Sequence, residues 1–307
     1  MRVLITGVEG FVGGHLAHAL AARGHEVWGT SLEDPPGGSP RRMRCDVRDL
    51  AALRRALSES GAEAIAHLAA RSSVVESLRE PLETYETNVG GAVNVLEASR
   101  LAGLEGPILL VGSGESYGDQ GAGAPLDEDA PLRPLSAYAA AKAAQELIGA
   151  QYARAYGLRV VSTRSFAHTG PGQEPRFALA GFARQLAALG RSGGSGELRA
   201  GNLTPVRDYL DVRDVVAAYA LLLERGERGA VRNVCSGQGF ALREYLDELI
   251  EIAGVEVEVR QDPALVREIE IERLVGDPGA LLADGWRPAI AKHDMLTDLL
   301  GYWSERT

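Results

Sequence analysis

The chain has 307 residues, enough for one large domain or two smaller ones with a sizeable core. Its 32 basic and 42 acidic residues give a net charge of -10, which argues against a nucleic-acid or anionic-membrane surface but allows a local basic pocket for an anionic substrate. No apolar run approaches the ~20 residues of a membrane span. Two distant cysteines, Cys45 and Cys235, indicate neither a disulfide framework nor a metal site. With no room for a signal peptide before the first expected strand, we expect a cytoplasmic protein.

The first expected element is a buried parallel strand. Arg2 to Thr6 is a β-branched and aliphatic run that leads directly into Gly7, Gly10 and Gly13, and then into a helical pattern. In a strand–turn–helix unit the first glycine allows the tight turn, the second lets backbone approach a pyrophosphate, and the third packs helix on strand. The sequence therefore predicts a dinucleotide site at the helix N-terminus. A plain tight turn is the alternative.

The second expected strand, 26–30, bears on the choice of nicotinamide cofactor. Asp or Glu at the end of this strand usually binds the ribose hydroxyls of NAD. This chain has Thr30 and Ser31 there, which leave space for a 2′-phosphate that Arg41 or Arg42 can neutralise. These residues favour NADP(H), with NAD(H) as the alternative.

Two further strands are expected before residue 70. Residues 35–40 have the composition of a loop. We interpret 44–47 as the third strand, ending in Asp46, whose carboxylate can accept from the adenine amino group. Residues 63–70 are interpreted as the fourth strand and the turn after it, where small alanines let backbone lie close to the cofactor. His67 lies in an apolar run and is expected to belong to the core.

The alternation of strands and helices continues to about residue 163. A helical segment over 81–101 precedes a strand over 107–111, which delivers Ser113 and Glu115 at its carboxyl end. Ligands bind at that end of the strands in open α/β sheets. With a further strand over 158–163, the pattern predicts a Rossmann-type, doubly wound parallel sheet in the α/β class.

Tyr138 and Lys142 are spaced four apart in a helical stretch that follows Ser136, so they lie on one helix face, one turn apart. A neighbouring ammonium favours the phenolate of a tyrosine, whose pKa is ordinarily ~10. Tyr138 is therefore the expected general acid/base for an alcohol/ketone pair, with Lys142 lowering its pKa and binding a cofactor ribose. An ordinary solvated helix face is the alternative, although Lys142 and Lys292 are the only lysines in the sequence.

The later part of the chain is less regular. Residues 192–196 are expected to form a flexible loop, 242–252 a helix and 255–259 a short strand. We expect 1–163 to form the dinucleotide-binding domain and 164–307 mainly a smaller α/β substrate lobe over the carboxyl edge of the sheet. Segments around 207–238 are expected to return to the first domain.

Together these residues outline one reaction. A nicotinamide gives or takes hydride, which protein side chains cannot do. Tyr138 protonates or deprotonates the oxygen of the carbon that receives hydride, and Ser113 hydrogen-bonds the same oxygen, so that the two form a small oxyanion hole. Taken alone, Ser113 is equally well explained as a turn-forming serine in a glycine-rich loop.

The glycine spacing, Ser113 and the Tyr138–Lys142 pair resemble those of the extended short-chain dehydrogenase/reductases, and the likeness covers essentially the whole chain. That family implies chemistry on a nucleotide-linked sugar. Within it, the GDP-6-deoxy-4-keto-D-mannose reductases use NADPH or NADH to reduce a 4-keto group, giving GDP-D-rhamnose. Four further runs resemble that group: 168–173, 201–212, 233–238 and 261–263.

The resemblance also implies roles for substrate-binding residues. Arg207 and Arg267 would hold the substrate diphosphate, which suits bidentate guanidinium geometry; ordinary surface arginines are the alternative. Glu115 matches the general base of related GDP-mannose dehydratases and is expected to orient substrate or act as an acid/base. Ala167 stands where the family has an Asn that contacts the nucleotide sugar, so the substrate contact there must differ. Ser165 replaces a proline and frees the backbone at that position.

The expected site residues fall into three groups, and no metal site is expected. The catalytic residues are Ser113, Glu115, Tyr138 and Lys142. The substrate contacts are Ser113, Glu115, Ala167, Arg207 and Arg267. The cofactor contacts are Gly7, Gly10, Phe11, Val12, Gly13, Thr30, Ser31, Asp46, Val47, Leu68, Ala69, Ala70, Tyr138 and Lys142.

Three functions stay open from the sequence. The first is an NAD(P)H-dependent 4-reductase of a GDP-linked 4-keto-6-deoxyhexose. The second is a 4-epimerase or 4,6-dehydratase that retains its NAD(P), and the third is a non-catalytic dinucleotide-binding sensor. A nucleotide sugar is the expected partner, without nucleic acid or membrane. A homodimer is also expected, because 83–101 and 137–156 are rich in small apolar residues and the family pairs these helices across a two-fold axis; burial inside one subunit would explain them as well.

Overall fold

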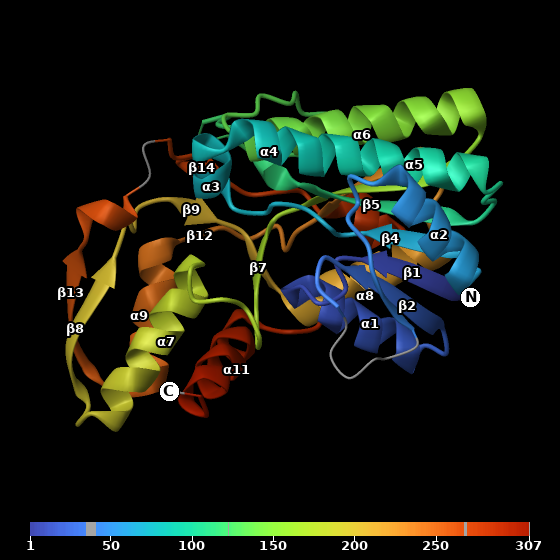
Figure 1. The fold of residues 1–307 in the computed structure, drawn as a ribbon. Coiled ribbons are helices and arrows are strands. Elements are labelled where there is room, and N and C mark those ends of the chain that lie inside the picture. The colour runs from blue at the N-terminus through green and yellow to red at the C-terminus, as the bar shows by residue number, and fades with distance from the viewer. Residues whose placement is uncertain (35–40, 122, 267–268, 307) are drawn as a thin grey trace.

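A computed structural model of the chain describes residues 1–34, 41–121, 123–266 and 269–306. Within these ranges a parallel sheet of seven strands forms the centre, in the order β11-β6-β5-β4-β1-β2-β3 (Figure 1). The order runs outward from β1 in both directions, which confirms the predicted Rossmann-type, doubly wound sheet. The strands are β1 (Arg2–Thr6), β2 (Glu26–Ser31), β3 (Arg42–Arg44), β4 (Ala64–His67), β5 (Pro107–Ser113), β6 (Arg159–Ser165) and β11 (Val231–Val234).

Helices cover both faces of this sheet, and each face has its own hydrophobic core. On one face, apolar side chains of the strands pack with helices α1 (Phe11–Ala22) and α8 (Val212–Arg225). On the other face they pack with α2 (Leu50–Ser60), α5 (Gly91–Leu101) and α6 (Ala137–Tyr156). Burial of the sheet from both sides explains why its strands read as nearly continuous apolar runs.

The predicted catalytic helix is α6, and local signals set both of its ends. The Ser136 hydroxyl accepts a hydrogen bond from the Ala139 N–H at 3.1 Å, and Gly157 follows the last turn with a φ of 75°. A Cβ atom on Gly149 would lie 2.6 Å from Leu110 Cδ1, so the glycine lets the helix lie close against β5. This packing brings the start of α6 to the carboxyl end of that strand.

A second group of elements lies to one side of the sheet and comes from the later part of the chain (Figure 1). Three helices enclose a further hydrophobic core beside two parallel strands. Two later elements return to the central sheet, since α8 packs on α1 and β11 pairs with β6. The elements of the second group are α7 (Ala178–Arg191), β8 (Ser195–Ala200), α9 (Leu242–Ala253), β13 (Glu256–Gln261) and α11 (Lys292–Ser304).

Several short strands, helices and turns complete the described structure. Strand β7 (Ala167–Thr169) pairs with β10 (Tyr209–Asp211). Strand β9 pairs with both β12 and β14. The remaining short elements are β9 (Val206–Arg207), β12 (Phe240–Ala241), β14 (Arg273–Leu274), α3 (Val74–Arg79), α4 (Pro81–Tyr85), α10 (Gly279–Ala283) and the 3₁₀ turns η3 (Gly114–Tyr117) and η4 (Pro263–Leu265).

Two expected elements are placed differently by the structure. The third strand is Arg42–Arg44 and not 44–47, because the edge pairing with β2 ends at Arg44, so Asp46 lies beyond the strand. The expected loop over 192–196 is wrong at its end, because Ser195 and Gly196 begin β8 and pair with β13, a partner that local composition does not reveal. The expected loop over 35–40 lies outside the described residues.

The helical segment expected over 81–101 is present, but a π-helical turn, η2 (Glu86–Gly90), interrupts it between α4 and α5. Asn88 lies in this turn and is fully buried. Its side-chain carbonyl accepts from the Arg71 N–H at 2.8 Å, and its amide donates to the Arg71 carbonyl at 3.0 Å. The turn therefore fixes the backbone that follows β4.

Candidate active site

The predicted site residues gather at the carboxyl edge of the sheet. Because all seven strands of the described sheet are parallel, the segments after β1, β2, β4 and β5 meet at the same edge. The glycine loop, Thr30, Ala69 and Ser113 occupy the ends of these strands. The arrangement matches the position of ligand sites in open α/β sheets.

The glycine loop is as close-packed as its spacing predicts. Gly7 has a φ of 75°, and a Cβ there would lie 2.9 Å from Ala69 Cα. A Cβ on Gly13 would lie 2.3 Å from the Gly7 carbonyl oxygen. No side chain caps the N-terminus of α1, where Phe11 and Val12 form the first turn, and that turn contains no acidic residue. The free N–H groups of this turn suit a pyrophosphate.

The end of β2 offers a second feature that fits a nucleotide. The Thr30 carbonyl accepts from the Gly7 and Val8 N–H groups at 2.8 and 3.1 Å, while its buried hydroxyl has no hydrogen-bond partner among the residues that the structure describes. The Ser31 hydroxyl donates to the Glu33 carbonyl at 2.8 Å. An orphaned hydroxyl beside an uncapped helix indicates that these residues fit a dinucleotide cofactor.

The arginines expected near a 2′-phosphate lie beside this strand and form ion pairs. Arg42 Nε lies 3.4 Å from Glu9 Oε1, and Arg41 Nε lies 3.5 Å from Glu26 Oε1. Glu9 belongs to the glycine loop, so Arg42 is held next to the predicted cofactor position.

The expected adenine contacts lie beyond β3. Asp46 accepts from Arg48, whose Nη2 is 2.6 Å from Oδ2, and this hydrogen bond holds the carboxyl pKa below its usual range. The Val47 carbonyl accepts from the Asn94 amide at 3.0 Å. The Asp46 carboxylate is therefore shared with a neighbouring guanidinium, which the sequence did not indicate.

The turn after β4 is tied to the sheet. The Leu68 N–H donates to the Thr6 carbonyl at 3.2 Å, and the Ala69 N–H donates to the Thr6 hydroxyl at 3.3 Å, with Ala70 following in the same turn. His67 is buried, as expected, with Nδ1 2.8 Å from the Thr6 hydroxyl. Burial, together with the Lys142 charge, lowers the pKa of His67 to about 3, so its imidazole is neutral.

The structure brings three of the expected catalytic residues together. Ser113 ends β5, and its hydroxyl caps η3 by accepting from the Glu115 N–H at 3.2 Å. The Tyr138 side chain lies close enough to Ser113 for the Ser113 hydroxyl to affect its ionisation. Burial raises the pKa of Tyr138 to about 12; the Ser113 hydroxyl opposes this rise and the charge of Glu115 adds to it.

Burial has the largest effect on the Tyr138 pKa, and the expected role of Lys142 in lowering that pKa stays a prediction. The Lys142 ammonium donates to the Val111 carbonyl at 2.7 Å and lies 3.2 Å from Gln145 Oε1. Lys142 is itself buried, and burial lowers its pKa to about 8. Desolvation therefore governs both members of the pair in the protein without cofactor.

A chain of hydroxyl groups lies next to Ser113. Ser165 is the register partner of Ser113 across β5 and β6. The Ser165 hydroxyl lies 2.6 Å from the Tyr219 hydroxyl and 3.1 Å from the Thr163 hydroxyl. Burial raises the pKa of Tyr219, and the proximity of Tyr138 raises it further, although Ser165 and Thr163 oppose the rise. The sequence drew attention to Ser165 but did not indicate its partner on α8.

The expected substrate contacts lie on two separate strands. Ala167 begins β7 and is half-buried. Arg207, on β9, is buried and donates from Nη2 to Glu270 Oε1 at 2.7 Å and from Nη1 to the Val206 carbonyl at 3.0 Å. The sequence did not indicate that Glu270 would pair with this arginine. Arg267 lies outside the described residues.

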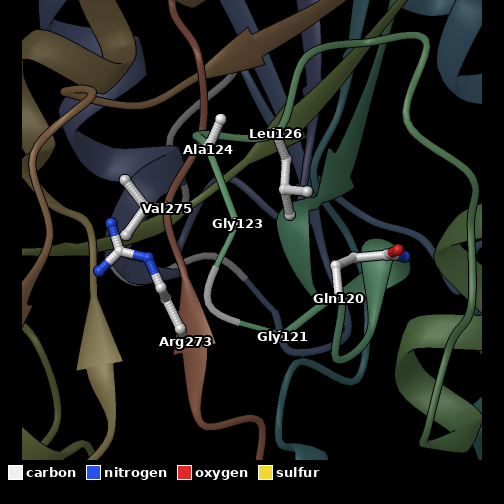
Figure 2. A pocket seen from close by; sticks show the side chains of 7 residues that line it. All are labelled: Gln120, Gly121, Gly123, Ala124, Leu126, Arg273 and Val275. Atoms are coloured by element: carbon white, nitrogen blue, oxygen red, sulfur yellow. The ribbon is translucent and has the colours of Figure 1, made fainter.

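A small pocket opens near the segment that follows Ser113 and Glu115, and it was not predicted. Figure 2 shows it between the loop after η3 and the strand β14, with Arg273 and Gln120 among the side chains that line it. Gln120 Nε2 donates to the Tyr117 carbonyl at 2.6 Å, which ties this wall to the candidate site. The described lining is Gln120, Gly121, Gly123, Ala124, Leu126, Arg273 and Val275.

In the described ranges, no three His, Cys, Asp or Glu side chains are grouped so that they could hold a metal ion. None of the helices in those ranges combines the length and apolarity needed to cross a bilayer.

Comparisons with known proteins agree with the geometry. The family described as GDP-mannose 4,6 dehydratase matches residues 4–299. GDP-6-deoxy-D-mannose reductase of Pseudomonas aeruginosa is 38% identical over 307 residues, covering 99% of this chain and 98% of the relative. The structure of RMD from Pseudomonas aeruginosa complexed with NADPH has a TM-score of 0.88 at 36% identity, covering 100% of this chain and 99% of the other. UDP-glucose 4-epimerase of Thermus thermophilus in complex with NAD has a TM-score of 0.89, also at 36% identity, covering 99% of each chain.

Proposed function

The chain belongs to the GDP-mannose 4,6-dehydratase-like family of extended short-chain dehydrogenase/reductases, and we propose that it reduces the 4-keto group of GDP-4-keto-6-deoxy-D-mannose to give GDP-D-rhamnose. The observation that carries this proposal is the nearness of Ser113, at the end of β5, to a Tyr138 side chain that is protonated near neutral pH, in a chain 38% identical to a GDP-6-deoxy-D-mannose reductase. A carbonyl reduction needs such a proton donor.

The roles of the residues follow from their positions. A nicotinamide, when bound at the glycine loop, would supply the hydride. The hydroxyls of Ser113 and Tyr138, which lie near each other, would both turn to the substrate carbonyl oxygen and stabilise the charge that develops there. Tyr138 would then transfer its proton to that oxygen. Lys142, held by Val111 and Gln145, would fix the helix face and meet a cofactor ribose.

An epimerase or dehydratase is the alternative, and Glu115 is the feature that favours it. Both of those reactions begin by taking a proton from substrate, for which a phenol with a pKa of about 12 is poorly suited. Glu115 lies near Tyr138 and carries a carboxylate that could act as a base in a dehydratase. The reductase is favoured because the tyrosine is set up to donate.

The proposal also specifies a GDP-linked substrate and a preference for NADPH. Arg207 would contact the diphosphate after exchanging its bond to Glu270, while Arg267 stays a prediction from the resemblance. For the cofactor, the orphaned Thr30 hydroxyl, Ser31 and the nearby Arg42 support NADPH, since no acidic side chain ends β2 to repel a 2′-phosphate.

A homodimer is also part of the proposal, although the alanines give less support than expected. Ala139, Ala143 and Ala153 are buried within the subunit, as the alternative explanation held. Large apolar side chains on the outer surfaces of α4 and α6 supply the support instead, with Leu82 76% exposed and Leu147 66% exposed. Such a surface favours pairing with a second copy.

A direct assay tests the reaction. Purified protein would receive GDP-4-keto-6-deoxymannose with NADPH and, separately, with NADH, while loss of the reduced cofactor is followed. Stoichiometric oxidation with formation of a new GDP-deoxyhexose is expected, and it should be faster with NADPH. Conversion of a nucleotide sugar without added cofactor would contradict the reductase and favour the alternative. If neither occurs, other nucleotide bases become the next substrates, because Ala167 removes a usual sugar contact.

A further inference from the structure

The Arg164 guanidinium contacts two parts of the candidate site, the catalytic helix α6 and the turn η3 that follows Ser113. Arg164 is in the interior of β6 and only 6% exposed, opposite Gly112 in the register with β5. Its Nε and Nη2 donate to the two carboxylate oxygens of Glu146 at 2.8 and 2.7 Å. Its Nη1 donates to the Tyr117 hydroxyl and to the Glu128 carbonyl, both at 2.9 Å. Three sides of the guanidinium are thus bound by separate parts of the chain.

The Glu146 contact reaches the catalytic helix. Glu146 follows Lys142 by one turn and Tyr138 by two turns, so the three side chains share one stripe of α6. Glu146 is 9% exposed and turned inward with that stripe. A two-point bond from β6 to Glu146 therefore fixes the rotation of α6 about its axis, and with it the direction of the Tyr138 side chain.

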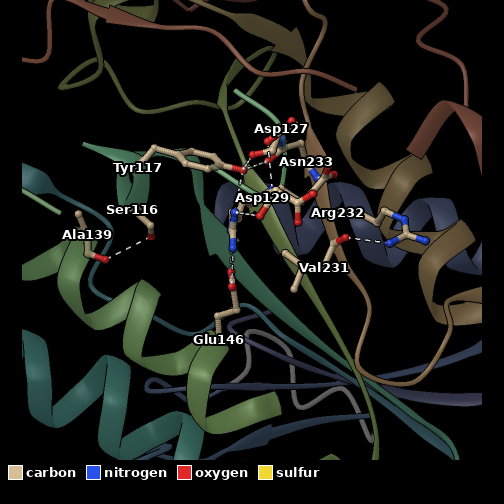
Figure 3. Close-up of polar contacts among 11 residues, drawn as sticks. Ser116, Tyr117, Asp127, Asp129, Ala139, Glu146, Val231, Arg232 and Asn233 are labelled. Atoms are coloured by element: carbon tan, nitrogen blue, oxygen red, sulfur yellow. Dashed lines mark hydrogen bonds and ion pairs between the residues drawn. The ribbon is translucent and has the colours of Figure 1, made fainter. Parts of the chain in front are cut away.

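The Tyr117 contact reaches the other half of the site. Tyr117 ends η3, the turn that Ser113 caps and that carries Glu115. Its ring is fully buried, and the Arg164 guanidinium carbon lies 4.9 Å from the ring centroid. The Ser116 hydroxyl in the same turn also donates to the Ala139 carbonyl at 3.2 Å (Figure 3). The Ser113 turn and the Tyr138 helix are therefore tied to each other directly and through Arg164.

The rest of the network closes around Tyr117 (Figure 3). The Tyr117 hydroxyl lies 2.7 Å from Asn233 Oδ1, and Asn233 donates from its backbone N–H to Glu128 Oε1 at 2.7 Å. Asn233 is on β11 and fully buried. The Tyr117 hydroxyl also lies 2.8 Å from the Asp127 carbonyl oxygen, so its one proton is shared between two acceptors and the phenol is held from several sides.

We propose that Arg164 is a positioning residue that, through Glu146 and Tyr117, holds the Ser113 hydroxyl near the Tyr138 hydroxyl. This inference rests on the proposed reductase function, because the pair it positions is the proposed proton-donating pair. The planar guanidinium makes the two-point carboxylate bond and the phenol bond at once, whereas the ammonium of a lysine is a point charge and cannot. Misplacement of a reacting group by about 1 Å can cost about 100-fold in rate.

The first test compares two arginine-to-lysine variants of the full-length protein. Arg164→Lys removes the network while keeping the charge. Arg232→Lys is the matched control, because Arg232 lies on the adjacent strand and makes its own two-point bond to Asp284 at 2.6 and 3.3 Å. Hydrogen–deuterium exchange of the unliganded proteins is expected to be about tenfold faster over 113–117 and the first turns of α6 in Arg164→Lys only.

Steady-state kinetics form the second readout. For Arg164→Lys we expect kcat to fall about 100-fold while the KM values for NADPH and for the keto sugar stay within about threefold. A residue that merely supports folding would lower the melting temperature without this division between kcat and KM. Arg232→Lys is expected to keep both constants.

The outcomes separate the two proposals. If the wild type does not reduce the keto sugar but Arg164→Lys shows the local change in exchange, the substrate assignment is wrong and the positioning role stands. If Arg164→Lys folds with unchanged exchange and unchanged kcat, the positioning role is wrong. If Arg164→Lys does not fold, Tyr117→Phe replaces it, since this change removes one hydroxyl alone. Its kcat should then fall about tenfold, and an unchanged kcat would overturn the inference.

Discussion

Desolvation governs the proton chemistry at the Tyr138–Lys142 pair. A Tyr and a Lys one helical turn apart suggest that the ammonium stabilises a phenolate, yet burial raises the Tyr138 pKa and lowers the Lys142 pKa. The lysine is bound by Val111 and Gln145, away from a direct role on the phenol. A Tyr138 that stays protonated would suit the proposed reduction.

Removing the Tyr138 hydroxyl should abolish turnover while the fold persists. General acids contribute roughly 100- to 10,000-fold, so Tyr138→Phe is expected to lower kcat about 1,000-fold. The melting temperature and the NADPH dissociation constant should stay close to wild type. Tyr156→Phe, at the exposed end of the same helix, is the control and should keep full activity. Substantial turnover by Tyr138→Phe would mean that another group donates the proton.

Lys142 should give the folding free energy a characteristic pH dependence. Its pKa is about 8 in the folded protein against an ordinary value of 10.5, so between these values the unfolded chain binds more protons. The free energy of unfolding attributable to Lys142 therefore rises from pH 8 to pH 10.5, by up to about 3 kcal/mol. Other groups titrate in this range, so the quantity to measure is the difference between wild type and Lys142→Met in urea unfolding. Parallel curves for the two proteins from pH 7.5 to pH 10 would exclude a buried, proton-releasing Lys142.

At the scale of elements, the π turn η2 fixes the backbone that follows β4. It places Asn88 where both atoms of its amide bond the backbone of Arg71. Arg71 directly follows the turn 68–70 that packs on the glycine loop, so the helical segment 81–101 indirectly supports the predicted cofactor site.

Asn88→Ala should weaken the cofactor site through this backbone. The change leaves the part-buried N–H and carbonyl of Arg71 without their Asn88 partner, which costs about 1–2 kcal/mol of unfolding free energy. The NADPH dissociation constant, from fluorescence titration, is expected to rise about tenfold. Ser99→Ala is the control, since the buried Ser99 hydroxyl bonds only the Val95 carbonyl of its own helix. An unchanged NADPH dissociation constant in Asn88→Ala would show that η2 does not support the cofactor site.

Elements defined by local patterns were predictable, and those defined by distant partners were not. Strands β1 and β2, helix α6 and the glycine loop follow from apolar periodicity, capping residues and glycine spacing. Strand β8 did not, because glycine-rich residues near 195 become a strand only by pairing with β13, about 60 residues later.

The same limit applies to the candidate site. The gathering of Ser113, Tyr138 and the glycine loop at one sheet edge was expected from the parallel topology. The partners Glu270 for Arg207 and Tyr219 for Ser165 were not, since each lies more than 50 residues away in sequence. Glu146 had a local signal, its spacing of four after Lys142, but nothing in the sequence pointed to Arg164 as its partner.

The whole molecule divides into the covered sheet and the group of elements around α7, α9 and α11. We propose that these correspond to the expected dinucleotide-binding and substrate parts, with α8 and β11 belonging to the first. The cytoplasmic location stays a prediction. Assembly is the property that can be tested most directly at this scale.

Disrupting the outer surface of α4 and α6 should produce monomers. Leu147→Glu introduces a charge on the outer surface of α6, where the leucine is 66% exposed. Light scattering after size-exclusion chromatography is expected to give a dimer for wild type and a monomer for Leu147→Glu. Leu32→Glu changes an equally exposed leucine after β2, 65% exposed, and should leave the dimer intact. A monomeric wild type would show that the proposed dimer does not form. A dimeric Leu147→Glu would show that the dimer interface lies elsewhere.

The position of β11 has a consequence for how the chain is made. Residues 166–230 separate β6 from β11, its neighbour in the sheet. Synthesis proceeds from the N-terminus. Strand β6, paired with β5 on one side, is therefore an edge strand with its other side open until residues 231–234 have emerged. Asn233 arrives with them and completes the contacts of Tyr117. The nascent protein therefore passes through a stage with an open, association-prone sheet edge, and closing that edge also completes the support of the active site.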